Sequence, residues 1–174
     1  MPIPDNIYLV GPMGAGKSTV GRQLAKQLRK DFIDCDTEIE RRTGASIPLI
    51  FEIEGEEGFR RRETTVLAAL AERRGVVLAT GGGAVLASEN REVLSGNGFV
   101  IYLASPAELL YERTYRDKNR PLLQTEDPLG RLQALVAERD PLYREVADLV
   151  MDTNRRTSRY TVRDIVRAVE RHDD

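Results

Sequence analysis

A glycine-rich stretch, GPMGAGKS at positions 11–18, has the residue types and spacing that bind the phosphates of a nucleotide. Its glycines let the backbone fold back so that successive amide groups point at one anion. A helix that begins near Lys17 directs the positive end of its dipole at the same point. Lys17 supplies a charge for the β- and γ-phosphates, and the Ser18 hydroxyl is a ligand for Mg²⁺. Because an apolar run at residues 7–10 precedes the stretch and a helical pattern at residues 19–28 follows it, the chain is predicted to bind a nucleoside triphosphate.

Two carboxylates, Asp34 and Asp36, follow the next apolar run and are candidates for metal and proton chemistry. Along an extended strand end their side chains would point to opposite sides. One would then reach the metal region near Ser18, while the other would face a second ligand. The alternative is a pair of ordinary strand-end acids, one of which caps the next helix. Because the only histidine is His172, near the end of the chain, proton transfer is expected to fall to a carboxylate or to the substrate itself.

Arginines and a second glycine cluster indicate the kind of acceptor. Glycines at residues 81–83 directly follow an apolar run, where they would let a substrate approach the backbone closely. Arg60 belongs to three consecutive arginines on a predicted helix, so at most one or two of them face the same side. Arg139 lies at a predicted break between helices. Arginines beyond those that serve phosphate favour an anionic acceptor, because a carboxylate matches the guanidinium fork.

Short apolar runs alternate with helical patterns along the chain. The runs predict strands at residues 7–10, 32–36, 76–79, 99–103 and 149–151. The patterns predict helices at residues 19–28, 38–42, 47–53, 59–72, 88–94, 106–115, 129–137 and 161–171, with a further short helix from Pro141. This alternation favours an α/β fold with a parallel sheet covered by helices on both faces. Such a sheet would bring the first glycine stretch, both carboxylates and the second glycine cluster to one edge, beyond the carboxyl ends of the strands.

Composition limits the classes of function. A length of 174 residues favours a single domain. The net charge of −2 gives no strong basic excess for binding nucleic acid, and no apolar stretch is long enough to cross a bilayer. Cys35 is the only cysteine, and the first residues do not resemble a signal peptide, so a cytoplasmic location and no intramolecular disulfide are expected.

A polar segment at about residues 116–127 is bracketed by prolines and poor in periodic apolar positions. A loop of this length in a compact domain is typical of a lid. Arg120 in this segment is the candidate for a positive charge that arrives at the phosphates when the lid closes, and we expect Arg120→Ala to lower kcat by roughly 10³ or more.

The motifs together resemble those of shikimate kinases from position 6 to about position 156. The resemblance rests on the glycine stretch, on DCD at positions 34–36 and on Glu, Phe, Arg and Glu at positions 56, 59, 60 and 63. It also rests on TGGG at 80–83, NRPLL at 119–123 and ERDPLY at 138–143.

This resemblance implies a P-loop kinase fold and ATP-dependent phosphorylation of the 3-hydroxyl of shikimate, a step in aromatic amino acid (chorismate) biosynthesis, by a monomer without nucleic-acid or membrane partners. It implies that ATP is held by Gly14, Ala15, Gly16, Lys17, Ser18, Thr19, Arg113, Arg120 and Arg156. It implies that Mg²⁺ is held by Ser18 and Asp34, and that shikimate is bound by Asp36, Arg60, Gly82 and Arg139. Asp36, Lys17 and Arg120 would be the catalytic residues, with the acceptor-binding segment at about residues 36–63.

Residue patterns alone leave other functions open. They do not separate shikimate from gluconate or from a nucleoside monophosphate as the acceptor. A GTP-dependent switch is a rival from another class, but the chain has no Asn-Lys-x-Asp stretch to read guanine. A catalytically silent binding module is a third alternative, against which the intact Lys17, Ser18, Asp34 and Asp36 argue.

Overall fold

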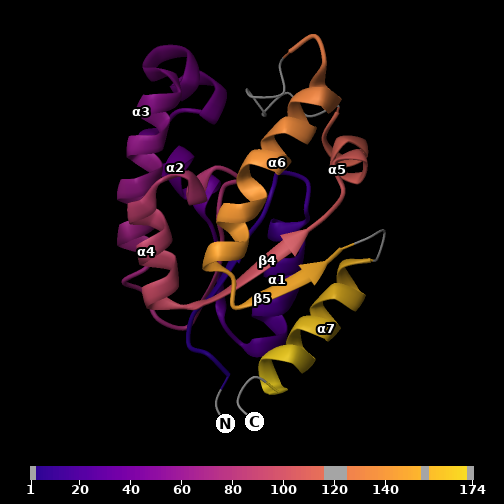
Figure 1. Ribbon diagram of the computed structural model, residues 1–174. Helices are drawn as coiled ribbons and strands as arrows, with labels where there is room; N and C mark the ends of the chain where they lie inside the picture. Colours follow the sequence, from indigo (N-terminus) through magenta and orange to yellow (C-terminus); the bar gives the residue numbers. More distant parts are fainter. Residues whose placement is uncertain (1–2, 116–124, 154–156, 172–174) are drawn as a thin grey trace.

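The computed structural model describes residues 3–115, 125–153 and 157–171. Within these residues the chain forms a five-stranded parallel sheet with the strand order β2-β3-β1-β4-β5 (Figure 1). The strands are β1 (Ile7–Val10), β2 (Asp31–Asp34), β3 (Val76–Ala79), β4 (Phe99–Ala104) and β5 (Leu149–Asp152). The predicted α/β fold class and all five strands are confirmed, with shifts of one or two residues at their ends.

Helices cover both faces of this sheet. They are α1 (Lys17–Leu28), α2 (Cys35–Thr43), α3 (Ile47–Leu70), α4 (Ser88–Asn97), α5 (Ala107–Thr114), α6 (Pro128–Val146) and α7 (Ser158–Arg171), with a short 3₁₀ helix at Ala84–Leu86. One core cluster joins α1 and α7 to the sheet, and a second joins α3, α4 and the later part of α6 to its other face. In the described chain, no helix combines the length with the apolar character needed to cross a bilayer.

The two-residue period of the strands explains why both faces must be covered. In β1, Ile7 and Leu9 belong to one core cluster, whereas Tyr8 and Val10 belong to the other. All four side chains are fully buried. A strand that is apolar on both sides is stable only between two layers of helices, which is the arrangement observed.

The helix α3 is longer than predicted. Ser46 caps the start of α3, because its side chain accepts a hydrogen bond from the Leu49 amide. The predicted separation into helices at residues 47–53 and 59–72 is wrong: within α3 only Gly55 leaves the helical conformation, with φ 73° and ψ 179°. A positive φ is accessible to glycine without a steric penalty, so one residue suffices to bend the helix there.

The helix α6 is also longer than predicted, since it continues through Pro141 to Val146. The predicted break between helices at Arg139 is therefore wrong. Proline removes one helical hydrogen bond and crowds the preceding turn. The residues beyond it nevertheless remain helical because Tyr143 and Val146 are buried in the core, at 0% and 5% exposure.

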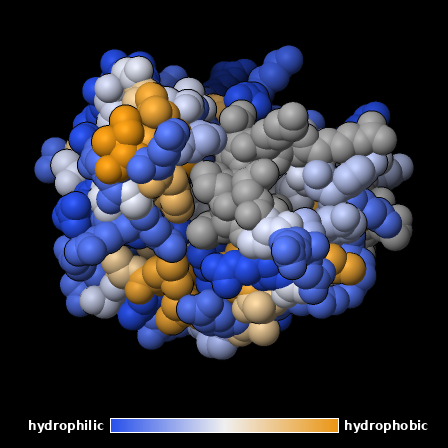
Figure 2. All heavy atoms as spheres, turned by 90° about the horizontal axis from the view of Figure 1, so that it is seen from above, coloured by the Kyte–Doolittle hydropathy of each residue, from blue (hydrophilic) through white to orange (hydrophobic). Residues whose placement is uncertain are grey.

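Seen from above, the described surface is mostly hydrophilic, with apolar atoms gathered at the left, over α3 (Figure 2). The exposed large apolar side chains of that helix are Leu49 and Ile53, both before the bend at Gly55. The predicted lid falls mainly on residues 116–124, which lie outside the described residues together with residues 154–156; Arg120 and Arg156 therefore have no structural description.

Candidate active site

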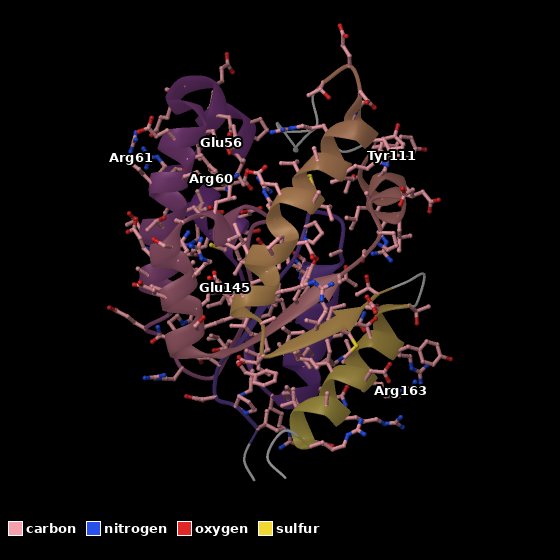
Figure 3. The ribbon with its side chains drawn as sticks, in the orientation of Figure 1. Glu56, Arg60, Arg61, Tyr111, Glu145 and Arg163 are labelled. Carbon is pink, nitrogen blue, oxygen red and sulfur yellow. The ribbon has the colours of Figure 1, made fainter. Side chains whose placement is uncertain are left out.

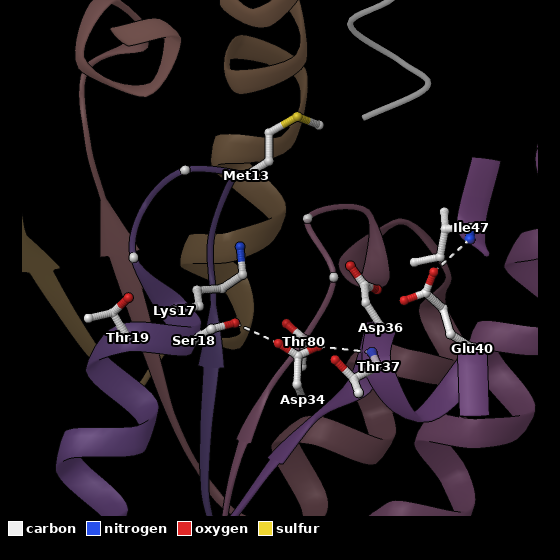
Figure 4. A pocket seen from close by; sticks show the side chains of 14 residues that line it. Met13, Lys17, Ser18, Thr19, Asp34, Asp36, Thr37, Glu40, Ile47 and Thr80 are labelled. Carbon is white, nitrogen blue, oxygen red and sulfur yellow. Dashed lines mark hydrogen bonds between the residues drawn. The ribbon is translucent and has the colours of Figure 1, made fainter. Parts of the chain in front are cut away.

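A cavity of about 370 Å³ lies beyond the carboxyl ends of β1, β2 and β3 (Figure 4). It brings together the glycine stretch, both carboxylates and the second glycine cluster, as the parallel sheet predicts. The lining residues are Met13, Gly14, Gly16, Lys17, Ser18, Thr19, Asp34, Asp36, Thr37, Glu40, Ile47, Thr80, Gly81 and Gly82.

The first glycine stretch forms a tight loop between β1 and α1. Gly11, Gly14 and Gly16 have backbone φ values of 146°, 82° and 93°. Residues other than glycine rarely adopt these values. Lys17 Nζ donates hydrogen bonds to the carbonyl oxygens of Gly11 at 2.6 Å and Pro12 at 2.9 Å. The ammonium group is thereby held over the loop, at the start of α1, where phosphate is favoured.

Ser18 and Asp34 lie side by side at the edge of the cavity. The Ser18 hydroxyl donates to Asp34 Oδ2 at 2.5 Å, and Asp34 Oδ1 accepts from the Thr37 amide at 3.1 Å as the cap of α2 (Figure 4). One hydroxyl and one carboxylate fit Mg²⁺, which takes few protein ligands and keeps water and phosphate oxygens as the rest. In keeping with that, the described residues contain no group of three or more His, Cys, Asp or Glu placed to bind a metal.

Asp36 does not lie on an extended strand end, so that prediction is wrong. The strand β2 ends at Asp34, which caps α2, and Asp36 lies in the first turn of this helix. The two carboxylates still diverge, but the strand-to-helix transition separates them rather than the alternation of a strand. Asp36 faces the second glycine cluster: a Cβ placed on Gly81 would lie 2.8 Å from Asp36 Oδ1.

Arg60 is the one of the three consecutive arginines that turns inward. Figure 3 shows it on the side of α3 that faces α6, with Arg61 on the outer side. Its Nη1 donates to Glu63 Oε1 at 3.0 Å, and its Nη2 donates to Glu56 at 3.3 Å. The side chains of Arg61 and Arg62 are more exposed, at 68% and 45%, than that of Arg60 at 22%.

Arg139 lies across the same region on α6 and is buried, with 4% exposure. A Cβ on Gly82 would lie 3.6 Å from its Nη1. Within the described chain, the Nε atoms of Arg60 and Arg139 are buried without a hydrogen-bond partner. Because an unmatched buried donor is costly, an acceptor on a ligand would relieve this condition.

The three glycines at 81–83 each contact a different part of the site. Added Cβ atoms would meet Asp36 and Glu63 at Gly81, Arg139 at Gly82 and the Arg60 guanidinium at Gly83. These side chains therefore pack closely against the backbone of the glycine cluster, and a side chain at Gly81 or Gly83 would displace them. The site has one end with a phosphate-binding loop and another with two inward arginines and a carboxylate.

Comparison with known proteins agrees with this geometry. The shikimate kinase family model matches residues 13–170. The chain belongs to the shikimate kinase family. The shikimate kinase of Methylococcus capsulatus is 58% identical over 166 residues, which cover 95% of this chain and 93% of that protein. The shikimate kinase of Halorhodospira halophila is 58% identical over 167 residues, covering 96% and 94%.

Solved structures extend the comparison. The shikimate kinase of Acinetobacter baumannii, solved in complex with shikimate, has a TM-score of 0.95 and 56% identity, covering 97% of this chain and 94% of that one. A gluconokinase from Sinorhizobium meliloti has a TM-score of 0.59 at 19% identity, covering 98% and 94%, and shares the fold alone. Family membership thus separates shikimate kinases from the gluconate kinases that the residue patterns left open.

A second cavity of about 270 Å³ adjoins the phosphate loop of this shikimate kinase family member. Arg113 lines it and donates from Nη1 to the Gly14 carbonyl at 2.9 Å. Ala15, Gly16 and Thr19 line it as well. This position beside the loop suits the part of the nucleotide that extends away from the phosphates.

Sequence reasoning assigned no role to two residues that shape the site. Glu63 was noticed only as part of a family motif, although its position three residues after Arg60 places both on one side of a helix. Its carboxylate is fully buried, and burial raises its pKa, opposed by the nearby charge of Arg60. Tyr143 follows Arg139 by four residues, but the break between helices predicted at Arg139 concealed this helical spacing.

Proposed function

We propose that the protein transfers the γ-phosphoryl group of ATP to the 3-hydroxyl of shikimate, a step in aromatic amino acid (chorismate) biosynthesis. The observation that carries this proposal is one cavity lined by a phosphate-binding loop, by Asp36 and by the turn at Gly81 and Gly82. Arg139 and Arg60 lie against that turn, at Gly82 and Gly83, and complete its acceptor end. Family membership supports the choice of shikimate, because the closely similar Acinetobacter baumannii enzyme was solved with shikimate bound.

At the phosphate end, the amides of Gly14, Ala15 and Gly16 and the ammonium group of Lys17 hold the β- and γ-phosphates of ATP, with Thr19 at the start of α1 beside them. Ser18 and Asp34 would hold Mg²⁺, which would supply positive charge to polarise the phosphoryl group. Arg113 lies along the nucleotide. Arg120 and Arg156 are also assigned to the nucleotide site, and this assignment rests on the family resemblance alone.

At the acceptor end, Arg60 and Arg139 bind the carboxylate of shikimate, and the Gly82 backbone lies against its ring hydroxyls. Asp36 accepts a hydrogen bond from the 3-hydroxyl and takes its proton as the oxygen attacks the γ-phosphorus. The new bond joins that oxygen to phosphorus, the bond to the bridging oxygen breaks, and ADP leaves. Catalysis then rests on alignment and on stabilising charge, which is the general requirement for phosphoryl transfer.

We also propose that residues 1–174 form a single P-loop kinase domain that acts as a cytoplasmic monomer. The support for a single kinase domain is that the chain covers 93% and 94% of two curated shikimate kinases. The net charge of −2 is consistent with small-molecule substrates rather than nucleic acid.

The test is ADP release with Mg-ATP and one hydroxy acid at a time, with the phosphate located by ³¹P NMR. Shikimate should support turnover, while gluconate and a no-acceptor control should not. Strong turnover on gluconate with none on shikimate would contradict the substrate assignment. Tight nucleotide binding with no acceptor-dependent turnover at all would instead favour a switch or a silent binding module.

A further inference from the structure

Tyr143 is a buried polar residue for which the proposed reaction gives no role. It lies on α6, four residues after Arg139, so the two side chains share one side of the helix. Its hydroxyl donates a hydrogen bond to the carbonyl oxygen of Gly82 at 2.5 Å, across 61 positions of sequence. The Tyr143 side chain has 0% exposure, whereas Gly82 is partly exposed, so the bond is anchored from the buried side.

The hydroxyl remains a donor over the whole working range of pH. Burial raises the pKa of Tyr143 to about 12, although the positive charge of Arg139 opposes the rise. The carbonyl oxygen of Gly82 therefore faces a protonated Tyr143 hydroxyl throughout that pH range. Losing that proton donor would leave the half-buried carbonyl of Gly82 without this partner, and an acceptor left unmatched costs more than the net contribution of the bond itself.

Tyr143 contacts the Gly81–Gly83 turn, against which Asp36, Arg139 and Arg60 of the acceptor end pack. Gly81 accepts a hydrogen bond from the Ala84 amide at 3.1 Å, which closes the turn from within. The carbonyl of Gly82 accepts its hydrogen bond from Tyr143, which lies outside the turn. Three glycines in a row have the largest backbone freedom of any tripeptide, so an external anchor is needed to keep one conformation.

We propose that Tyr143 is a positioning residue that locks the Gly81–Gly83 turn to α6, so that Arg139 and the Gly82 backbone form one rigid receptor for the acceptor. This inference rests on the proposed function. Arg139 and Tyr143 are attached to the same helix, so the distance between the arginine and the turn is set by one element rather than by a flexible loop. Tyr143 itself need not touch the substrate.

The chain provides a matched control in Tyr102. Its ring lies 4.9 Å from that of Tyr143, and it is almost as buried, at 2% exposure. Its hydroxyl, however, donates to Asp140 Oδ1 at 2.7 Å and not to the glycine turn. Removing either hydroxyl deletes one oxygen from a packed aromatic ring. The two substitutions differ in the neighbours that lose a contact, which are Gly82 and Arg139 for Tyr143 and Asp140 for Tyr102.

The experiment compares the full-length wild type with Tyr143→Phe and Tyr102→Phe. In Tyr143→Phe we expect KM for shikimate to rise roughly fivefold to tenfold, with KM for ATP changing less than about twofold, because the phosphate loop does not depend on this bond. Tyr102→Phe should leave both constants near wild type. Hydrogen exchange in the unliganded proteins should show faster exchange of the Ala84 amide in Tyr143→Phe only, and melting temperatures report any loss of folding.

Other outcomes contradict the inference. Unchanged KM for shikimate in Tyr143→Phe, or an equal rise in Tyr102→Phe, would mean that the hydroxyl serves stability alone. A rise in KM for ATP as large as that for shikimate would also exclude a role confined to the acceptor end. A wild type without shikimate-dependent turnover would instead contradict the proposed function, and this inference with it.

Discussion

Arg60 and Glu63 lie one turn apart on α3, and Nη1 of the arginine is 3.0 Å from Oε1 of the glutamate. The two partners differ in their access to water: the Glu63 side chain is 1% exposed and that of Arg60 is 22% exposed. Because the Glu63 side chain is enclosed by its neighbours, it has less freedom to move than Arg60. Glu63 therefore determines where the guanidinium group of Arg60 lies. Because that group rests against Gly83, the pair also connects α3 to the Gly81–Gly83 turn of the acceptor end.

Replacement of Glu63 by Gln is expected to raise KM for shikimate about tenfold, because a charge-assisted bond that orients Arg60 becomes weaker. KM for ATP should change little. Glu56→Gln is the matched control, since Glu56 meets the same arginine at 3.3 Å but is 46% exposed. An exposed ion pair contributes little, so Glu56→Gln should have a small effect. Equal effects of the two substitutions on KM would contradict the role given to burial.

The same residue predicts a dependence of stability on pH. Burial raises the pKa of Glu63 above its ordinary value of 4.5, so the folded protein holds this proton more tightly than the unfolded chain. The free energy of unfolding should therefore fall, through this group, as pH rises from 4.5 through the raised pKa. Gln at this position cannot titrate. Urea unfolding should then show the wild type losing stability relative to Glu63→Gln as pH rises above 4.5. A gain in stability would mean that Arg60 outweighs burial.

The carboxylate clamp can be tested with a modified substrate. Arg60→Ala or Arg139→Ala should weaken shikimate binding by about 1.5–3 kcal/mol, the usual contribution of a hydrogen bond to a charged group. The methyl ester of shikimate should bind the wild type more weakly than the acid, but should bind either variant about as well as the acid does. Calorimetry on folded protein measures both. If ester and acid bound the wild type alike, the arginines would not contact the carboxylate.

Asp36→Asn is expected to lower kcat by roughly 10²–10⁴, the range for loss of a general base. Asn keeps the size of the side chain, so nucleotide affinity, measured by titration, should be nearly unchanged. Near-normal kcat would mean that Asp36 only orients the acceptor and that the proton leaves by another route.

Removal of Mg²⁺ with EDTA should abolish turnover, and added Mg²⁺ should restore it. Ser18→Ala and Asp34→Asn should each raise the Mg²⁺ concentration that gives half-maximal rate, because each weakens one oxygen ligand. Asn at position 34 can still cap α2, so its melting temperature serves as a check that the helix is intact. An unchanged Mg²⁺ requirement in both variants would place the metal elsewhere.

The sequence alone determined the fold class and the phosphate end of the site. Both depend on contiguous residues: apolar runs with a period of two, helical patterns with a period near 3.6, and a glycine loop that starts a helix. Lys17 and Ser18 lie next to each other in the chain, so their joint position at the start of α1 follows from local geometry.

The acceptor end was decided by contacts between distant segments. Asp36 is helical because Asp34 caps α2, and α6 passes through Pro141 because Tyr143 and Val146 are buried in the core. Tyr143 and Gly82 meet across 61 positions, which no local pattern records. Local propensity is worth a fraction of a kcal/mol to about 3 kcal/mol per residue, and burial of apolar side chains across the core can override it. Only the packed structure therefore determines which polar groups are enclosed and which of them meet.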